Sequence, residues 1–284
     1  MSREILTLLA VHAHPDDEAI SMGGVLARAA AEGIRTVLLC TTLGGCGALH
    51  DSDCDLEEAK RNLAAVREQE LRRACAVLGL TDLYLLGYGD SGMAGAPDNA
   101  DPRNFLNAPP NEACARVTLL MRQVRPQVVT YNALGSYGHP DHIAAHRVTL
   151  AAVEAAADPL SFPELGVPPW QVQKLYYTVR PRGEITHLQA VLRRHGLAVP
   201  NRPGFKMSIA VPDELGTTRV DIRAYLDQKR AALRLHRSQL DPDNVLLTMP
   251  EHVAREAWGV ESFQRVFAHV PVPAREDDLF VGLR

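Results

Sequence analysis

Short apolar runs alternate with longer amphipathic stretches along the first half of the chain. Apolar runs bounded by polar or glycine-containing segments are typical of buried strands. Strands are therefore predicted at Ile5–Ala13, Arg35–Thr42, Asp82–Leu86 and Gln127–Tyr131. Apolar residues at helical spacing predict helices at Glu18–Ala31, Leu56–Leu78, Cys114–Val124 and Ile143–Ala157. This alternation of strands and helices indicates an α/β fold, with a parallel sheet covered by helices on both faces.

Two long polar segments, Leu43–Asp55 and Gly87–Asn111, interrupt this pattern. Long loops in a compact domain are usually functional or disordered. Both segments follow predicted strands, and α/β proteins bind their ligands at the carboxyl edge of the sheet. We therefore expect the functional site at this edge.

The composition changes after Ala157, where four prolines lie close together, as in an exposed connection. Beyond them the pattern predicts a strand at Lys174–Val179, helices near Ile185–His195 and Ile222–Leu240, and a terminal strand around Phe263–Phe267. We interpret residues 1–157 as the α/β core and residues 158–284 as a C-terminal extension that completes or caps the same domain.

The composition is that of an ordinary globular protein, with 46% hydrophobic and 23% charged residues in 284. The net charge of −4 and the absence of a long basic run argue against nucleic acid or an acidic membrane as a partner. The apolar run Ile5–Val11 is too short to span a membrane, and no signal-peptide cleavage pattern follows it. Five cysteines without a CxxC pair indicate free thiols. We expect a cytoplasmic protein.

Two clusters of histidines and carboxylates follow predicted strands. His14–Glu18 reads His-Pro-Asp-Asp-Glu, and Tyr137–His142 reads Tyr-Gly-His-Pro-Asp-His. A catalytic divalent metal typically has three nitrogen or oxygen ligands from the protein and one position for water. His14 and Asp17 from the first cluster, with His142 from the second, would supply such a set. Both Zn²⁺ and Fe²⁺ are compatible with two histidines and an aspartate.

The remaining polar residues of these clusters suit a hydrolase. Asp16 would lie near the bound water as a general base, and His139 could act as an acid or stabilise an oxyanion. A single such cluster could simply be a helix cap with a proline turn. Two clusters at two strand ends make that explanation much less attractive. His12 and His146 fit packing roles better than metal binding, because of their positions in the predicted strand and helix.

These two motifs together resemble the LmbE-like, or PIG-L, family of zinc-dependent de-N-acetylases, nearest its mycothiol and bacillithiol branch. The resemblance covers roughly residues 5–157, and Lys229–Leu240 is also similar to a late helix of the family. It implies a Rossmann-like α/β fold and hydrolysis of the acetamide of N-acetylglucosamine conjugates. It also implies that His14, Asp17 and His142 bind the metal and that Asp16 activates the zinc-bound water.

The resemblance extends to residues around the metal and the sugar. It implies that His139 stabilises the tetrahedral oxyanion, that Asp141 modulates His139, and that Tyr137 polarises the carbonyl. Arg67 and Asp90 match residues that bind the sugar, although the sequence alone also permits a solvated Arg67–Glu70 pair and a simple turn at Asp90.

The segment Leu43–Gly47 departs from the family, because it lacks the acidic residue common in thiol-sugar members. The departure leaves the part of the substrate beyond the sugar, the aglycone, undefined. We expect the aglycone to lie against Leu43–Asp55.

The leading hypothesis is a zinc hydrolase that deacetylates a small N-acetylglucosaminyl conjugate, with a homo-oligomer possible. An amidase that acts on a larger thiol-sugar conjugate is the first alternative. A metal-dependent lyase or hydratase acting on an oxo-acid is the second, and it would require carboxylate-binding arginines such as Arg67 and Arg103. A non-catalytic metal-binding protein is the third, and it would leave Asp16 and His139 without a role.

Overall fold

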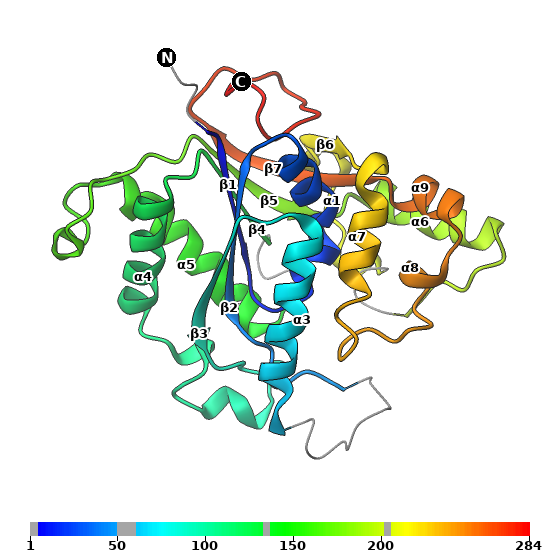
Figure 1. Cartoon of the computed structure of the whole chain (residues 1–284), viewed down its shortest axis with the longest axis horizontal. Helices are drawn as coiled ribbons and strands as arrows, with labels where there is room; N and C mark the ends of the chain where they lie inside the picture. Colours follow the sequence, from blue (N-terminus) through cyan, green and yellow to red (C-terminus); the bar gives the residue numbers. More distant parts are fainter. Residues whose placement is uncertain (1–4, 50–60, 133–136, 202–205) are drawn as a thin grey trace.

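The central feature of the computed structural model is a mixed sheet with helices on both faces (Figure 1). The structure describes residues 5–49, 61–132, 137–201 and 206–284. In these residues the strand order is β3-β2-β1-β4-β5-β7-β6. The strands are β1 (Thr7–His12), β2 (Arg35–Thr42), β3 (Asp82–Tyr88), β4 (Val128–Asn132), β5 (Lys174–Val179), β6 (Thr218–Asp221) and β7 (Val260–Ala268). The helices are α1 (Asp17–Ala31), α3 (Leu63–Leu78), α4 (Pro110–Val124), α5 (Pro140–Ala157), α6 (Arg182–Arg194), α7 (Leu226–Leu233), α8 (Val245–Thr248) and α9 (Glu251–Trp258).

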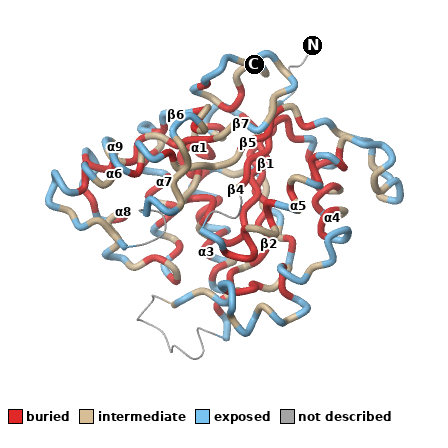
Figure 2. The backbone as a smooth tube through the Cα atoms, turned by 180° about the vertical axis from the view of Figure 1, so that it is seen from behind, coloured by how far each residue is buried: buried red, intermediate tan, exposed pale blue. Residues whose placement is uncertain are grey.

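Two hydrophobic cores lie on opposite faces of the sheet. In β1, Leu8 and Ala10 pack into the core beneath α1, α3 and α7, while Leu9 and Val11 pack into the core beneath α4 and α5. Both faces of this strand are therefore buried, as expected for a central parallel strand. Figure 2 shows the same layering as a buried backbone along the inner strands, with exposed segments around the rim.

The parallel strands reverse their spatial order between β1 and β4. From β1 the chain adds β2 and β3 on one side, while β4 and β5 follow on the other side. Ligands of open α/β sheets bind at such a switch point, in the crevice outside the carboxyl ends of the strands. Both predicted histidine clusters follow these two strands, so the topology brings them to one place.

The predicted fold class is confirmed, and several element bounds are confirmed with it. The strands at Arg35–Thr42 and Lys174–Val179 have the predicted bounds. In the predicted helix Leu56–Leu78, residues 56–60 lie outside the described part of the chain, and α3 begins at Leu63. A single helix over Ile222–Leu240 is wrong. The α7 helix ends at Leu233, because the following turns direct the buried side chains of His236 and Ser238 toward other helices.

The chain after residue 157 extends the same sheet. The β5 strand pairs parallel with β4, whereas β7 pairs antiparallel with both β5 and β6. The short elements β6, α8 and α9 were not predicted, because four to eight residues carry too little periodicity. Among the described residues, no helix combines the length and apolar character needed to cross a bilayer.

A buried ion pair supports a break in α1. Met22 has non-helical torsion angles (φ −150°, ψ 23°), which interrupt the helical hydrogen bonds of the next turn. The amides of Gly24 and Val25 donate instead to the carboxylate of Glu261, at 3.0 and 2.8 Å. The Lys229 ammonium donates to this carboxylate at 2.6 Å and to the freed carbonyl of Ile20 at 3.1 Å. The C-terminal half of the chain thereby fixes the direction of the first turn of α1.

Lys229→Met should lower the free energy of unfolding by about 3–5 kcal/mol, because it leaves the Glu261 carboxylate buried without its cation. Urea denaturation of the variant and the parent measures this difference. Lys206→Met, which removes an exposed lysine, serves as the control and should change stability little. A loss below about 1 kcal/mol for Lys229→Met would show that the ion pair does not support the helix break.

Candidate active site

Three side chains from the two strand ends converge on one point. The Nδ1 atom of His14 lies 3.2 Å from Nε2 of His142, and the Asp17 Oδ2 atom lies 3.3 Å from that Nε2 and 3.9 Å from that Nδ1. Tetrahedral zinc with bonds of about 2.0–2.1 Å places its ligand atoms roughly 3.3–3.4 Å apart. The buried donor atoms therefore fit three corners of such a site. We call His14, Asp17 and His142 the metal tripod.

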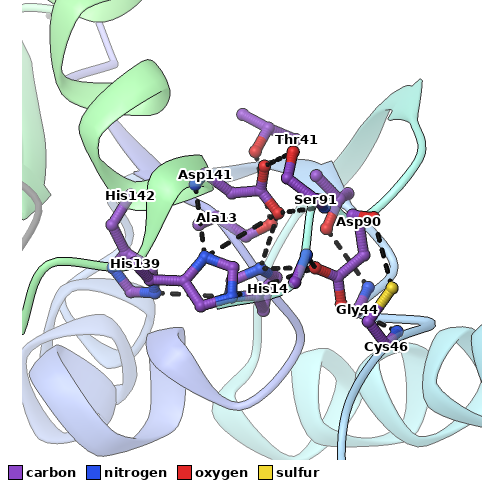
Figure 3. Close-up of polar contacts among 12 residues, drawn as sticks. Ala13, His14, Thr41, Gly44, Cys46, Asp90, Ser91, His139, Asp141 and His142 are labelled. Atoms are coloured by element: carbon purple, nitrogen blue, oxygen red, sulfur yellow. Dashed lines mark hydrogen bonds and ion pairs between the residues drawn. The ribbon is translucent and has the colours of Figure 1, made fainter. Parts of the chain in front are cut away.

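The other ring nitrogens of the tripod histidines also have polar neighbours. The Nε2 atom of His14 lies 3.2 Å from Oδ2 of Asp141, and Nδ1 of His142 lies 2.9 Å from the Asn132 side-chain amide (Figure 3 shows the contact of His14 with Asp141). A histidine that binds a metal through one nitrogen donates a hydrogen bond from the other. Metal binding by His142 thus requires the Asn132 oxygen to face Nδ1, and the Thr178 hydroxyl can then accept from the amide nitrogen.

Asn132→Ala should weaken metal affinity by about 10- to 100-fold, the usual effect of removing the partner of a metal-binding histidine. Competition with a metal-buffering chelator measures the dissociation constant without relying on activity. Asn107→Ala, which removes an exposed asparagine at the end of a short 3₁₀ helix, is the matched control. Equal metal affinity in Asn132→Ala and the parent would mean that Asn132 does not orient His142.

Asp16 lies beside the tripod in a left-handed backbone conformation. Its φ of 100° is unusual for a residue other than glycine, although aspartate and asparagine adopt this region most readily. Its amide donates to Oε2 of Glu18 at 3.0 Å, and Oε1 of Glu18 lies 2.7 Å from Nε2 of His236. Burial raises the pKa of Asp16 to about 6, and the Arg67 guanidinium partly opposes this effect. A base with a pKa near the operating pH is suited to accept a proton from water.

Arg67 and Glu70 lie on α3 and bind neighbouring segments of the chain beside the tripod. Both side chains are buried, so a solvated Arg67–Glu70 pair is wrong. The Arg67 guanidinium donates to the carbonyls of Pro15 and Gly44, at 2.6 and 2.7 Å, and lies 3.4 Å from Oδ2 of Asp16. Glu70 accepts from the amide and hydroxyl of Ser238. Arg67 thus fixes the backbone beside the tripod, and sugar binding by Arg67 stays a prediction.

His139 caps α5 and presents a donor to the site. Its Nδ1 atom accepts a hydrogen bond from the Asp141 amide at 3.2 Å, so in the neutral ring Nε2 carries the proton. Burial lowers the pKa of His139, which favours this neutral form. The Tyr137 ring lies 6.1 Å from that of His139 and 5.1 Å from that of His142, between ring centroids. Burial also raises the pKa of Tyr137, so its hydroxyl stays protonated and able to donate.

The Asp141 carboxylate lies closer to a tripod histidine than to His139. It is 3.2 Å from the His14 ring and 3.9 Å from the nearest His139 nitrogen, and it accepts hydrogen bonds from the amide and hydroxyl of Ser91. The resemblance implies that Asp141 modulates His139, and this role stays a prediction. In the structure, Asp141 makes its shorter contact to His14.

Asp90 lies on the other side of the site, where its carboxylate accepts from the amides of Cys46 and Gly92, at 2.9 and 2.8 Å. Its Oδ1 atom lies 3.8 Å from Nε2 of His14 and 3.9 Å from Nε2 of His139. Asp90 does not face Arg67 directly: Gly44–Cys46 lies between them and is hydrogen-bonded to both. Its binding to a sugar hydroxyl stays a prediction.

A second group of side chains could also hold a cation. His14, Asp90, His139 and Asp141 offer donor atoms within 4.8 Å of one another. Ser91 already donates twice to Asp141, and the protonated Nε2 of His139 faces this group. The tripod is therefore the better metal centre. His12 and His146 belong to neither group in the described residues, and His146 packs against the Tyr131 ring.

A known protein family matches the part of the chain that contains both histidine clusters. The PIG-L family, described as GlcNAc-PI de-N-acetylase, matches residues 9–153, which contain the complete tripod. The chain belongs to the PIG-L family. It is therefore an enzyme, a deacetylase that hydrolyses an amide C–N bond outside peptide bonds.

Individual relatives cover nearly the whole chain. A protein of Geodermatophilus obscurus named 1D-myo-inositol 2-acetamido-2-deoxy-alpha-D-glucopyranoside deacetylase is 42% identical over 97% of each chain. A protein of the same name from Acidothermus cellulolyticus is 40% identical over 98% of this chain and 96% of its own. The crystal structure of the conserved protein TT1542 from Thermus thermophilus is 29% identical, with a TM-score of 0.62 over 95% of this chain and 98% of its own.

Proposed function

We propose that this PIG-L member removes the acetyl group from a small 2-acetamido-2-deoxyglucoside, with Zn²⁺ in the metal tripod. The observation that carries this proposal is the tripod itself, with a separate half-buried carboxylate, Asp16, and a separate donor, His139, at its margin. A purely structural zinc site is closed by four protein ligands. Two relatives whose names specify an inositol glycoside of N-acetylglucosamine support the class of substrate.

The reaction places distinct demands on these residues. When bound, the metal would polarise the acetamide carbonyl and acidify water. Asp16 takes a proton at its carboxylate as the water oxygen forms a bond to the carbonyl carbon. The carbon–nitrogen bond then breaks, and the sugar nitrogen leaves as an amine once it has received a proton. The products are acetate and the free amino sugar.

His139 and Tyr137 act where negative charge develops. The His139 Nε2–H group donates to the carbonyl oxygen as that oxygen becomes an oxyanion, and the Tyr137 hydroxyl adds a second donor from the rim. His139 is held by its hydrogen bond from the Asp141 amide before the reaction, so it needs little reorganisation in the transition state. The proton that the leaving amine requires is the one that Asp16 has accepted from water.

His139→Ala should lower kcat by about 10²- to 10³-fold, the usual effect of removing one oxyanion donor. Steady-state kinetics of the metal-loaded variant test this value, and KM should change much less than kcat. His187→Ala removes an exposed histidine on α6 and provides the control. A kcat within about threefold of the parent would assign the oxyanion to another donor.

The decisive test of the function is release of acetate and free amine in equal amounts from the α-N-acetylglucosaminide of myo-inositol. Cleavage of a bulkier acyl group at a higher rate than acetate would favour the conjugate amidase. Activity on an oxo-acid without amine release would favour the hydratase, but the two arginines that the sequence offered for it, Arg67 and Arg103, give it little support. The Arg67 guanidinium already donates to two backbone carbonyls, and the Arg103 side chain is 86% exposed and paired with Asp101. Cytoplasmic location and oligomeric state stay predictions.

A further inference from the structure

A cavity of about 200 Å³, with both polar and apolar side chains in its wall, adjoins the metal tripod on the side of β5. Asn132, the partner of His142, forms part of its wall, as do Ile20 and Ser21, one turn beyond Asp17. At about 30 Å³ for each water molecule, this volume equals six or seven waters and would accept a small polar group. The cavity is therefore next to the reacting centre but separate from the ligands and catalytic groups described above.

The wall of this cavity carries a cation without a close partner. Arg180 directly follows β5, and its guanidinium makes no hydrogen bond and no ion pair within 4 Å to any residue that the structure describes. Burial lowers the pKa of Arg180, which reflects the unfavourable removal of this cation from water. A guanidinium has five N–H donors in a planar fork, so an unpaired one beside a cavity can receive an oxyanion.

The other charged groups of the cavity are already paired. Lys229 and Glu261 form the ion pair that supports the break in α1. Glu184 lies 3.2 Å from the Arg219 guanidinium and accepts a hydrogen bond from the Ser262 hydroxyl. Both carboxylates attract Arg180 only through space. Among the charged residues that line the cavity, Arg180 is therefore the one without a partner within 4 Å in the described part of the chain.

We propose that this cavity receives an anionic group on the aglycone of the substrate, and that Arg180 binds its carboxylate or phosphate oxygens. The inference rests on the proposed deacetylase function and extends it to the part of the substrate beyond the sugar. It also places the aglycone beside β5 rather than against Leu43–Asp55. A planar fork that pairs with two oxygens would favour charged conjugates over neutral ones of the same shape.

The test compares two matched pairs of α-N-acetylglucosaminides by acetate release from the zinc-loaded enzyme. The lactate and lactamide glycosides differ only in a carboxylate, and the myo-inositol 1-phosphate and myo-inositol glycosides differ only in a phosphate. We expect kcat/KM to favour the charged member by about 10- to 100-fold in at least one pair, mainly through KM. The pair that shows the preference identifies the anion.

Variants then assign the preference to Arg180. Arg180→Gln should reduce the charged-to-neutral ratio to about one, and Arg180→Lys should restore part of it. Arg182→Gln removes an equal charge from a nearby exposed residue outside the cavity, and it should retain the parental ratio. Thermal denaturation of each variant confirms that it is folded.

Three results would overturn the inference. These are equal kcat/KM values within both pairs for the parent, an unchanged ratio in Arg180→Gln, or equal losses on charged and neutral compounds in that variant. The last result would show that Arg180 supports the fold rather than the aglycone. Absence of acetate release from all four compounds would instead contradict the deacetylase function. Release without any preference would contradict only the role of Arg180.

Discussion

Asp16→Asn should retain its metal and lose about 10²- to 10⁴-fold in turnover, because an amide cannot take the proton that a positioned general base removes. The substitution suits the local backbone. Asparagine tolerates the left-handed conformation of residue 16 as well as aspartate does. Its side-chain oxygen can also preserve the contact with the Arg67 guanidinium, which lies 3.4 Å from Oδ2 in the parent.

Metal content and kcat must be measured on the same preparation of this variant. Asp16 is outside the tripod, so one metal per chain is expected in both Asp16→Asn and the parent. Asp227→Asn removes a carboxylate whose side chain is 70% exposed on α7, and it should leave both quantities unaltered. Turnover close to that of the parent in a metal-loaded Asp16→Asn variant would remove Asp16 from the mechanism.

The sequence could predict the parts of the site that local patterns encode. His14 and His142 follow strands that the apolar pattern already predicted, and parallel strands end at the same edge of a sheet. To predict that the two histidines converge, only the order of the strands in the sheet was needed in addition. Asn132 and Arg180 also follow predicted strands, at β4 and β5. They were missed because a lone asparagine or arginine at a strand end is chemically less specific than a cluster of histidines and carboxylates.

Other parts of the site depend on contacts between residues far apart in the chain. Glu18 meets His236, and Glu70 meets Ser238, at separations of 218 and 168 positions. The Lys229–Glu261 pair completes the broken turn of α1 from the C-terminal half. No periodicity encodes such pairings, because each depends on how the C-terminal half of the chain packs against α1 and α3. Residues after 157 therefore contribute to the site even though both motifs lie before them.

His142→Ala should lose bound metal and deacetylase activity together, while the chain stays folded. The variant deletes one of three converging ligand atoms and leaves Asp17 with only His14. The loss should exceed the roughly 10- to 100-fold weakening expected when only the partner of a ligand is removed, as in Asn132→Ala. The two cores on either side of the sheet do not contain the tripod, so the fold itself should persist.

Elemental analysis after dialysis, together with thermal denaturation with and without added Zn²⁺, separates these effects. A ligand that binds only the folded state raises stability by about 4 kcal/mol at a thousandfold excess over its dissociation constant. The melting temperature of the parent should therefore rise on addition of Zn²⁺, whereas that of His142→Ala should not. The control His187→Ala should behave as the parent, because His187 is exposed on α6 and belongs to neither ligand group. Full metal retention and a normal response to Zn²⁺ in His142→Ala would contradict the tripod, and the group of His14, Asp90, His139 and Asp141 would then be the metal centre to test.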